Sequence, residues 1–278
     1  MPDKLIIALF GGDNPGQLKS KVEPFRKYLS VKLHTEVEFL FTSDYASVIQ
    51  AIRSKKVHLA ELTPFAYVIA TQKPGLTPLV ILGSNGSPSL YRSVIIANPK
   101  NGIKTIEDLK KHAKELTICF GDPASTSGHL IPREYLISIG LDPGNKAFKE
   151  MMFSGNHTAT IMNVASGKVD IGCSNKDLSI DLLLRQGIIK DESLVILWLS
   201  PPIVNNAIVI RDDINKDVSM QIKNIYLNLA KDAPDIFQNM ISTYYPDAKK
   251  MSYVPAQDSS YESLRKVANS IKDLNFTK

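Results

Sequence analysis

Apolar runs of strand length alternate along the chain with amphipathic stretches of helical period. Lys4–Phe10 is an apolar run that predicts a strand, and Gln17–Leu33 carries apolar side chains three and four residues apart, which predicts a helix. Glu36–Phe41, Tyr45–Ser54 and Val57–Leu62 continue the alternation as strand, helix and strand. Strands separated by single helices predict an α/β fold, in which a mainly parallel sheet is covered by helices on both faces.

One part of this pattern occurs twice. Glu38–Thr63 aligns without gaps with Glu150–Asn175 at an offset of 112 residues, which places Tyr45 opposite His157. Each copy has the pattern strand, capped turn, helix and strand, so we expect two α/β lobes. Because open α/β sheets bind ligands at the carboxyl ends of their strands, we expect a ligand cleft with Tyr45 and His157 on opposite walls.

The two lobes are expected to be connected by two crossovers. Apolar strands near residues 92–97 and 203–208 are suited to this role. Lobe 1 would then comprise residues 1–93 and 207–278, and lobe 2 would comprise residues 94–206. This division places Tyr91 just before the first crossover and Asn205 and Asn206 at the rim of the cleft.

A turn rich in hydroxyl groups is the strongest candidate for a binding site. Ser125, Thr126 and Ser127 follow the apolar run Leu116–Phe120 and precede a helical pattern. At a helix N-terminus, side-chain hydroxyls and unpaired backbone N–H groups favour an anion. Capping alone would need one hydroxyl rather than three. The turn lacks the P-loop lysine and the Gly-x-Ser-x-Gly pattern of a nucleophile elbow.

The rest of the sequence points to binding rather than to a reaction. The histidines have no zinc-binding spacing, so we expect no metal and no cofactor, but His157 at a helix start could give an oxyanion a charge-assisted hydrogen bond. No recognisable acid/base spacing joins the candidate acids Asp122, Asp170 and Asp177. The two cysteines, Cys119 and Cys173, are expected to be small buried residues, although one disulfide between them stays open.

Composition excludes several classes of protein. Hydrophobic residues make up 44% of the 278 residues and charged residues 22%, which is ordinary for a globular chain. The net charge is +5, but the basic residues are scattered along the chain, so nucleic-acid binding is not expected. No apolar run approaches the roughly 20 residues of a membrane span. The chain is therefore expected to be soluble, and either cytosolic or an exported protein in which Met1 replaces a removed signal.

The combination of these motifs resembles the phosphonate- and phosphite-binding proteins of ABC importers. The specific match is Ser125-Thr126-Ser127-Gly128-His129-Leu130-Ile131-Pro132, close to the family's Ser-Thr-Ser-Gly-Tyr-Leu-x-Pro. The supporting matches are Asp44-Tyr45, Tyr91, Ser154-Gly155-Asn156-His157 and Gly167-Lys168-Val169-Asp170. The resemblance covers nearly the whole chain, from Phe10-Gly11 to the region of Leu264.

The resemblance implies a two-lobed periplasmic binding protein fold of type II, with a mixed sheet flanked by helices in each lobe and the ligand in the hinge cleft. It implies that the PO₃ group is held by Tyr45, Tyr91, Ser125, Thr126, Ser127 and His157. Asn205 and Asn206 stand where relatives that bind aminoalkyl phosphonates tend to carry Asp-Asp. We therefore expect Asn205 at the site and a ligand without an amine, such as phosphite or methylphosphonate. An aromatic wall, for which Tyr91 is the candidate, would disfavour the additional hydroxyl of phosphate.

The expected partners are this small phosphorus oxyanion and an ABC permease. A monomer in the periplasm, or one tethered to the cell surface as a lipoprotein, is expected, with no insertion into the membrane. The alternatives are a binding protein for 2-aminoethylphosphonate or phosphate, an enzyme such as a transferase on the same scaffold, and the sensing module of a cytosolic regulator. The last would need a DNA-binding segment for which the chain has no spare length.

Overall fold

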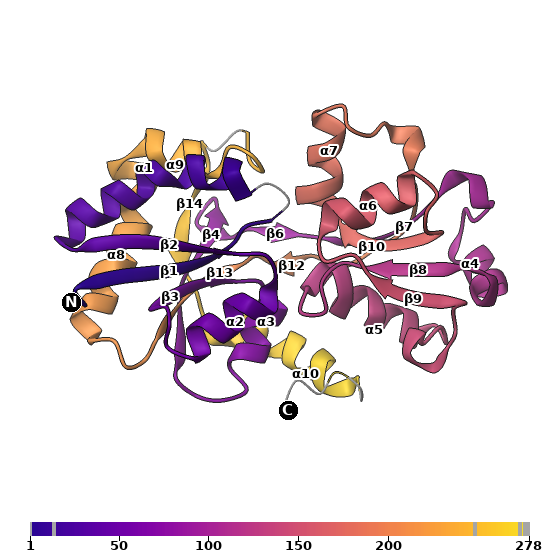
Figure 1. Ribbon diagram of the computed structural model, residues 1–278, viewed down its shortest axis with the longest axis horizontal. Helices are drawn as coiled ribbons and strands as arrows, with labels where there is room; N and C mark the ends of the chain where they lie inside the picture. Colours follow the sequence, from indigo (N-terminus) through magenta and orange to yellow (C-terminus); the bar gives the residue numbers. More distant parts are fainter. Residues whose placement is uncertain (1, 13–14, 247–248, 272–273, 275–278) are drawn as a thin grey trace. The chain divides into compact units, whose positions relative to one another are not determined.

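The computed structural model describes residues 2–12, 15–246, 249–271 and 274. Contacts between residues divide the chain into two compact units, each of them α/β as predicted (Figure 1). Unit 1 comprises Met1–Ser89 and Val204–Leu264, and unit 2 comprises Leu90–Ile203 and Arg265–Lys278. Among the described residues, no helix combines the length and the apolar character that crossing a bilayer would require.

Unit 1 is built on a seven-stranded mixed sheet of order β14-β4-β13-β3-β1-β2, with β5 paired to β4. Its strands are β1 (Lys4–Phe10), β2 (Glu36–Thr42), β3 (Leu59–Leu62), β4 (Leu76–Ser84), β5 (Ser87–Pro88), β13 (Ala207–Arg211) and β14 (Met251–Pro255). Its helices are α1 (Pro15–Leu33), α2 (Tyr45–Arg53), α3 (Pro64–Ala70), α8 (Lys216–Asp232), α9 (Pro234–Ile241) and the 3₁₀ turn η7 (Asp258–Tyr261). The helix α10 (Glu262–Ser270) contains the boundary at Leu264.

The helices of unit 1 cover both faces of its sheet. In Figure 1, α1, α8 and α9 lie on one face and α2 and α3 on the other. The first face holds an apolar core in which Leu5, Ile7 and Leu59 of the sheet pack with Phe25 of α1 and Tyr226 of α8. Because β2 and β3 both run parallel to β1, the carboxyl ends of these three strands lie at one edge of the sheet.

Unit 2 repeats this construction on a five-stranded sheet of order β11-β7-β10-β8-β9. Its strands are β7 (Ser93–Ala97), β8 (Thr117–Phe120), β9 (Glu150–Phe153), β10 (Ile171–Asn175) and β11 (Val195–Leu199). Its helices are α4 (Ile106–His112), α5 (Ile131–Ser138), α6 (His157–Ala165), α7 (Asp181–Arg185), the π-helical turns η3 (Thr126–Leu130) and η5 (Lys176–Ile180), and the 3₁₀ turns η1 (Pro99–Asn101), η2 (Ala113–Glu115), η4 (Pro143–Asn145) and η6 (Asp191–Ser193). In Figure 1, α6 and α7 lie on one face of the sheet and α5 on the other.

The internal repeat is confirmed element by element. The helix α2 and the helix α6 begin and end at positions separated by the same offset, and each is preceded by a capping side chain. Asp44 accepts a hydrogen bond from the N–H of Ser47, and Asn156 accepts one from the N–H of Ala159. The strand orders β3-β1-β2 and β10-β8-β9 also correspond, with parallel pairing in both.

The observed units differ from the expected lobes at their boundaries. The sequence places the boundaries after residues 93 and 206, whereas the contacts place them after Ser89 and Ile203 and assign Arg265–Lys278 to unit 2. Ser93 belongs to unit 2 because it begins β7, which pairs with β10 and β11. The short strands β6 (Leu90–Tyr91) and β12 (Ile203–Val204), which pair with each other, lie in the segments where the chain passes from one unit to the other.

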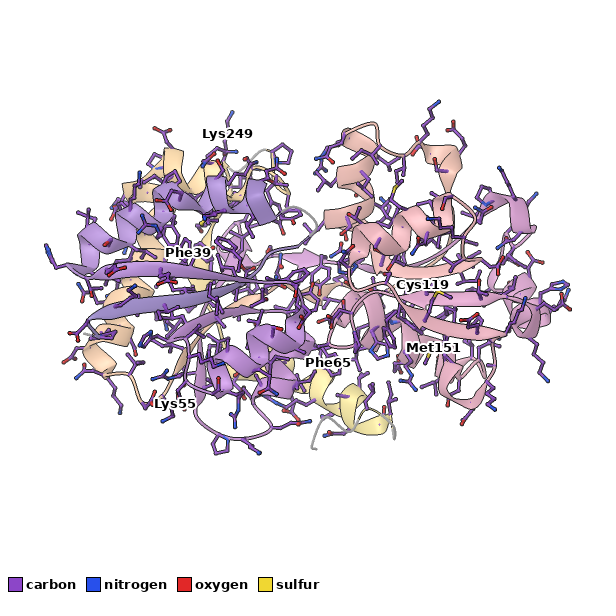
Figure 2. The ribbon with its side chains drawn as sticks, in the orientation of Figure 1. Phe39, Lys55, Phe65, Cys119, Met151 and Lys249 are labelled. Atoms are coloured by element: carbon purple, nitrogen blue, oxygen red, sulfur yellow. The ribbon has the colours of Figure 1, made fainter. Side chains whose placement is uncertain are left out.

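The two cysteines are free and buried. Cys119 on β8 belongs to the apolar core that faces α6, and Cys173 on β10 belongs to the core that faces α5. The neighbouring strands pair Gly172 with Cys119, so Cys173 is one residue further along and points to the opposite face. A disulfide between these two side chains is therefore excluded by the pleat of the sheet. Figure 2 labels Cys119 within this sheet.

Candidate functional site

The hydroxyl-rich turn of unit 2 lies at the carboxyl end of β8. Ser125 precedes η3, and η3 continues without interruption into α5. The hydroxyl of Ser125 accepts a hydrogen bond from the N–H of Gly128 at 3.0 Å, which is the capping role that the sequence leaves open beside anion binding. Asp122 supports the turn, because its carboxylate accepts from the N–H of Ala124 at 2.7 Å. The candidate acid Asp122 is thus a structural residue of the loop.

Ser127 has a different environment from Ser125. It is 2% exposed, and its carbonyl accepts a hydrogen bond from the hydroxyl of Ser93 at 2.7 Å. Ser93 is itself held by β-strand contacts and by Ser200, whose hydroxyl accepts from the Ser93 N–H at 2.9 Å. Within the described part of the chain, the hydroxyl of Ser127 has no hydrogen-bond partner. Ser127 Oγ is not among the fully buried polar atoms that lack a partner, so it can be hydrated, and its hydrogen can be donated to a ligand oxygen.

Gly128 allows two polar side chains to approach the same point of the turn. A Cβ atom at this position would lie 2.9 Å from Ser125 Oγ and 3.1 Å from His157 Cε1. A larger residue at this position would require Ser125 or His157 to shift, so glycine allows this close packing. The turn after β8 and the start of α6 are therefore in direct contact, and Ser125 and His157 flank the same glycine.

His157 is the first residue of α6 and lies beside the carboxyl end of β10. Its Nδ1 is 3.2 Å from the hydroxyl of Ser174. Burial lowers the pKa of His157 to about 4, so the imidazole is neutral near pH 7. A neutral ring can still give an oxyanion the charge-assisted hydrogen bond expected from the sequence, because the acceptor carries the charge: when Ser174 donates to Nδ1, the ring proton is on Nε2, which can donate to an anion.

Tyr45 occupies the equivalent position in unit 1. It is the first residue of α2, directly after the cap Asp44, and its ring packs against Phe10 with centroids 4.3 Å apart. Phe10 ends β1, so Tyr45 lies at the edge where β1 and β2 have their carboxyl ends. The predicted equivalence of Tyr45 and His157 is confirmed within each unit.

Tyr91 lies two residues before Ser93, whose hydroxyl contacts the Ser127 turn. It ends β6 and is buried, and two residues later Ser93 donates to the carbonyl of Ser127. The intervening Arg92 is paired with Asp177, whose carboxylate accepts from the guanidinium at 2.7 Å and from the Arg92 N–H at 2.6 Å. The carboxylate of Asp177 therefore forms an ion pair with Arg92.

The side chain of Asn205 forms hydrogen bonds within unit 1. Its side-chain amide donates to Ser89 Oγ at 3.1 Å and to Tyr245 Oη at 2.7 Å. Its carbonyl oxygen accepts from the N–H of Asn206 at 2.8 Å. These three hydrogen bonds explain its burial, and two of them use both amide hydrogens, so the side chain of Asn205 has no donor left for an anion.

Other candidate residues are also structural. His129 is buried between the rings of Phe120 and Phe153, and its Nδ1 is 2.7 Å from the carbonyl of Pro123. Asp170 accepts from both the N–H and the hydroxyl of Thr117 at 2.8 Å. In the described ranges, no group of three or more His, Cys, Asp or Glu side chains could hold a metal ion.

Three residues that shape this site are not among those predicted from the sequence. Ser93 and Ser174 support Ser127 and His157, and Gly128 provides the space between the hydroxyl and the imidazole. Gly128 lies in the recognised motif and could have been singled out. Ser93 is 34 positions from its partner and Ser174 is 17 positions from its own, so no local pattern identified them.

Comparison with known proteins identifies the family. The family described as "ABC transporter, phosphonate, periplasmic substrate-binding protein" matches residues 7–261. The phosphate-import protein PhnD of Mycolicibacterium smegmatis is 27% identical, with 96% of this chain and 86% of the relative aligned. The phosphonates-binding periplasmic protein of Escherichia coli is 29% identical over 82% of this chain and 66% of the relative.

A solved structure agrees with this fold. PhnD1 of Prochlorococcus marinus in complex with methylphosphonate superposes with a TM-score of 0.82 at 24% identity, covering 97% of this chain and 98% of that one. This similarity shows the periplasmic binding protein fold. Because the family match extends over most of the chain, the protein belongs to the phosphonate family of periplasmic substrate-binding proteins of ABC transporters, a family of binding proteins rather than enzymes.

Proposed function

We propose that this protein captures a small phosphorus oxyanion, a phosphonate or phosphite, and delivers it to the permease of an ABC importer. The observation that carries the proposal is the hydroxyl of Ser127, which has no partner among the described residues and lies in a turn of three hydroxyl residues at the start of a helix. Family membership supplies the partner class, and the turn supplies the chemistry that recognises the ligand.

The turn is suited to a PO₃ group because it and the adjacent start of α6 offer neutral hydrogen-bond donors. The Ser127 hydroxyl and the Nε2–H of His157 can each donate to one oxygen, and the positive end of the η3–α5 helical segment favours negative charge. Neutral donors bind an anion without bringing a buried countercharge. An anion close to His157 would raise the pKa of the imidazole from about 4, since the charged ring would then be stabilised.

Tyr45, Tyr91 and Thr126 complete the set of proposed ligand contacts. Tyr45 is proposed as a further hydroxyl donor from unit 1, on the strength of its equivalence to His157. Tyr91 is proposed as the aromatic wall that faces the fourth substituent of phosphorus. A P–H or P–C group suits such a wall. Phosphate carries a hydroxyl as its fourth substituent, and this hydroxyl would lose a hydrogen bond against the wall at a cost of about 1–3 kcal/mol.

We propose that phosphate is not the preferred ligand of this protein, although one relative is named as a phosphate-import protein.

We further propose that the protein acts as a monomer and that, in the periplasm, it is either free or tethered as a lipoprotein. Sedimentation at several protein concentrations tests the first point, since a dimer would show a concentration-dependent mass.

Isothermal titration calorimetry with methylphosphonate, phosphite, phosphate and sulfate tests the function. We expect methylphosphonate or phosphite to bind at least 5-fold more tightly than phosphate, as the cost of an unpaired hydroxyl implies, and sulfate to bind weakly or not at all. Equal binding of phosphate and methylphosphonate would contradict the role of the wall. Failure of all phosphorus compounds to bind would contradict the proposed function.

A further inference from the structure

The carbonyl groups of the hydroxyl-rich turn in unit 2 are engaged within the protein. The N–H of Gly121 donates to the carbonyl of Gly128 at 2.9 Å, and the hydroxyl of Ser93 donates to the carbonyl of Ser127 at 2.7 Å. From residue 121 to residue 128, all carbonyl groups except that of Ala124 have such a contact: Gly121, Asp122, Pro123, Ser125, Thr126, Ser127 and Gly128. A hydrogen on a ligand oxygen would therefore compete with the protein's own donors for these carbonyl oxygens.

The same turn keeps hydroxyl groups that can donate. The hydroxyl of Ser127 has no partner among the described residues, so its hydrogen is available to a ligand oxygen. The hydroxyl of Ser125 accepts from the N–H of Gly128 at 3.0 Å and keeps its own hydrogen for a second contact. A hydroxyl that accepted from the ligand would have to give its hydrogen to another acceptor, and the carbonyl groups of the turn already have donors. The turn therefore favours a ligand whose oxygens all accept.

Ser174 determines whether His157 adds a donor or an acceptor to this set. Ser174 lies on β10 with 0% of its surface exposed, and its hydroxyl is 3.2 Å from Nδ1 of His157. If Nδ1 carried the ring proton, it would donate to Ser174, whose hydroxyl hydrogen would then need an acceptor; no other partner of this hydroxyl occurs among the described residues. Donation from Ser174 to Nδ1 satisfies both groups. The ring proton then lies on Nε2, which is a donor and cannot accept.

The charged and titratable groups on the elements around His157 have contacts of their own. Lys176 and Asp177, in η5, each belong to an ion pair. Asp122 and His129, in and after the turn that follows β8, contact backbone groups of that turn. Loss of hydration is what lowers the pKa of His157 to about 4, so the ring of the free protein is neutral from about pH 5.5 to about pH 9.

We propose that this site in unit 2 selects the fully deprotonated form of its ligand, and that Ser174 secures the selection by keeping His157 a donor. The ligand is the phosphorus oxyanion of the proposed function, on which this inference rests. A monoanion carries a hydrogen on one of its oxygens, and that hydrogen would meet a donor where the dianion presents an acceptor. Every residue involved belongs to unit 2, with Ser174 as a positioning residue that acts through His157.

Phosphite and methylphosphonate test the selection, because phosphite loses its second proton at a lower pH than methylphosphonate does. Calorimetry on the unaltered protein between about pH 9 and about pH 5.5 should show a constant affinity while each ligand is a dianion. Below the second pKa of each ligand, its affinity should fall by up to about 10-fold per pH unit, as the dianion becomes scarce. The two curves should be offset by the difference between the two ligand pKa values. Protonation of His157 would act in the opposite direction, since a charged imidazole binds an anion more tightly.

Phosphorus NMR observes the bound ligand directly. At a pH about one unit below the second pKa of free methylphosphonate, most of the free ligand is protonated. The bound ligand should keep the chemical shift of the dianion at that pH, because the protein binds the deprotonated form.

Nitrogen NMR of the imidazole rings tests the role of Ser174. In the unaltered protein, His157 should show a protonated Nε2 and an unprotonated Nδ1, and His157→Gln identifies its signals. Ser174→Ala should populate the second tautomer and make the fall in affinity with pH shallower, because Nε2 could then accept. It should also weaken methylphosphonate binding at about pH 9 by about 3- to 10-fold, as the loss of one hydrogen bond implies.

Thr160→Val is the matched control. It removes a hydroxyl that is also 0% exposed, on the same helix as His157, where it lies 2.6 Å from Ser154 Oγ. The variant should lower the melting temperature but keep the His157 tautomer and the pH dependence of binding. An effect of Ser174→Ala that Thr160→Val does not share is therefore specific to the imidazole.

Four results would overturn the proposal: the same pH dependence for both ligands, a protonated bound ligand, a His157 ring with its proton on Nδ1 in the unaltered protein, or an unchanged tautomer and affinity in Ser174→Ala. In each case phosphite or methylphosphonate still binds at about pH 9, so the proposed function survives. If the unaltered protein binds neither ligand at any pH, both proposals fail together.

Discussion

Ser127→Ala separates ligand binding from stability more cleanly than any other change in the turn. The hydroxyl of Ser127 has no partner among the described residues, whereas its carbonyl, which holds Ser93, is part of the backbone and is retained in alanine. The substitution therefore removes a proposed ligand donor and no hydrogen bond within the protein. Ser125→Ala is the matched control, since it removes the cap on the Gly128 N–H at 3.0 Å.

The expected magnitudes follow from these contacts. A hydrogen bond to a charged group contributes about 1.5–3 kcal/mol, so Ser127→Ala should weaken phosphonate binding by roughly 10- to 150-fold. Its melting temperature should stay within about 1–2 °C of the unaltered protein. Loss of the Ser125 cap costs about 0.5–2 kcal/mol, and at about 2–4 °C per kcal/mol for a domain of this size it should lower the melting temperature measurably.

Calorimetry with methylphosphonate and thermal unfolding without ligand provide the two measurements. The reasoning would be refuted if Ser127→Ala bound methylphosphonate as tightly as the unaltered protein. It would be refuted equally if Ser127→Ala lost as much stability as Ser125→Ala, because the hydroxyl would then have an internal structural role.

Three further changes test the site and its support. The pKa of His157 is about 4 in the folded protein, against about 6.5 in the unfolded chain. The neutral imidazole therefore contributes up to about 3 kcal/mol to the free energy of unfolding, which is present above pH 6.5 and is lost as pH falls toward 4. His157→Gln should flatten the fall in melting temperature on the acid side, and an unchanged slope would contradict a neutral imidazole. Gly172→Ala would place a Cβ 2.6 Å from Val164 Cγ2 and 3.0 Å from Thr160 Cγ2, and should destabilise the protein by about 1–3 kcal/mol in denaturant unfolding; wild-type stability would mean that α6 does not pack this closely on β10. Tyr91→Ala should narrow the ratio of phosphite to phosphate affinity in calorimetry, and a constant ratio would remove the aromatic wall.

Local patterns in the sequence determine a large part of this fold. The strand Lys4–Phe10 lies where its apolar run predicts, and α2 begins at Tyr45, where the helical pattern predicts its start. The repeat predicts the matching helices α2 and α6 at one constant offset, so the equivalence of Tyr45 and His157 follows from the sequence. These features depend on side chains within one or two turns of each other, and their spacing is visible in the chain itself.

Contacts between distant strands determine the remainder. The position of β13 between β3 and β4 brings Asn206 to Glu61, and β7 brings Ser93 to Ser127. Strand order also fixes the opposite orientation of Cys119 and Cys173. No periodicity in the chain encodes which strands become neighbours, and the hydration that a side chain loses depends on all the elements packed around it. The tertiary structure alone therefore makes His157 neutral and places Ser174 beside its Nδ1.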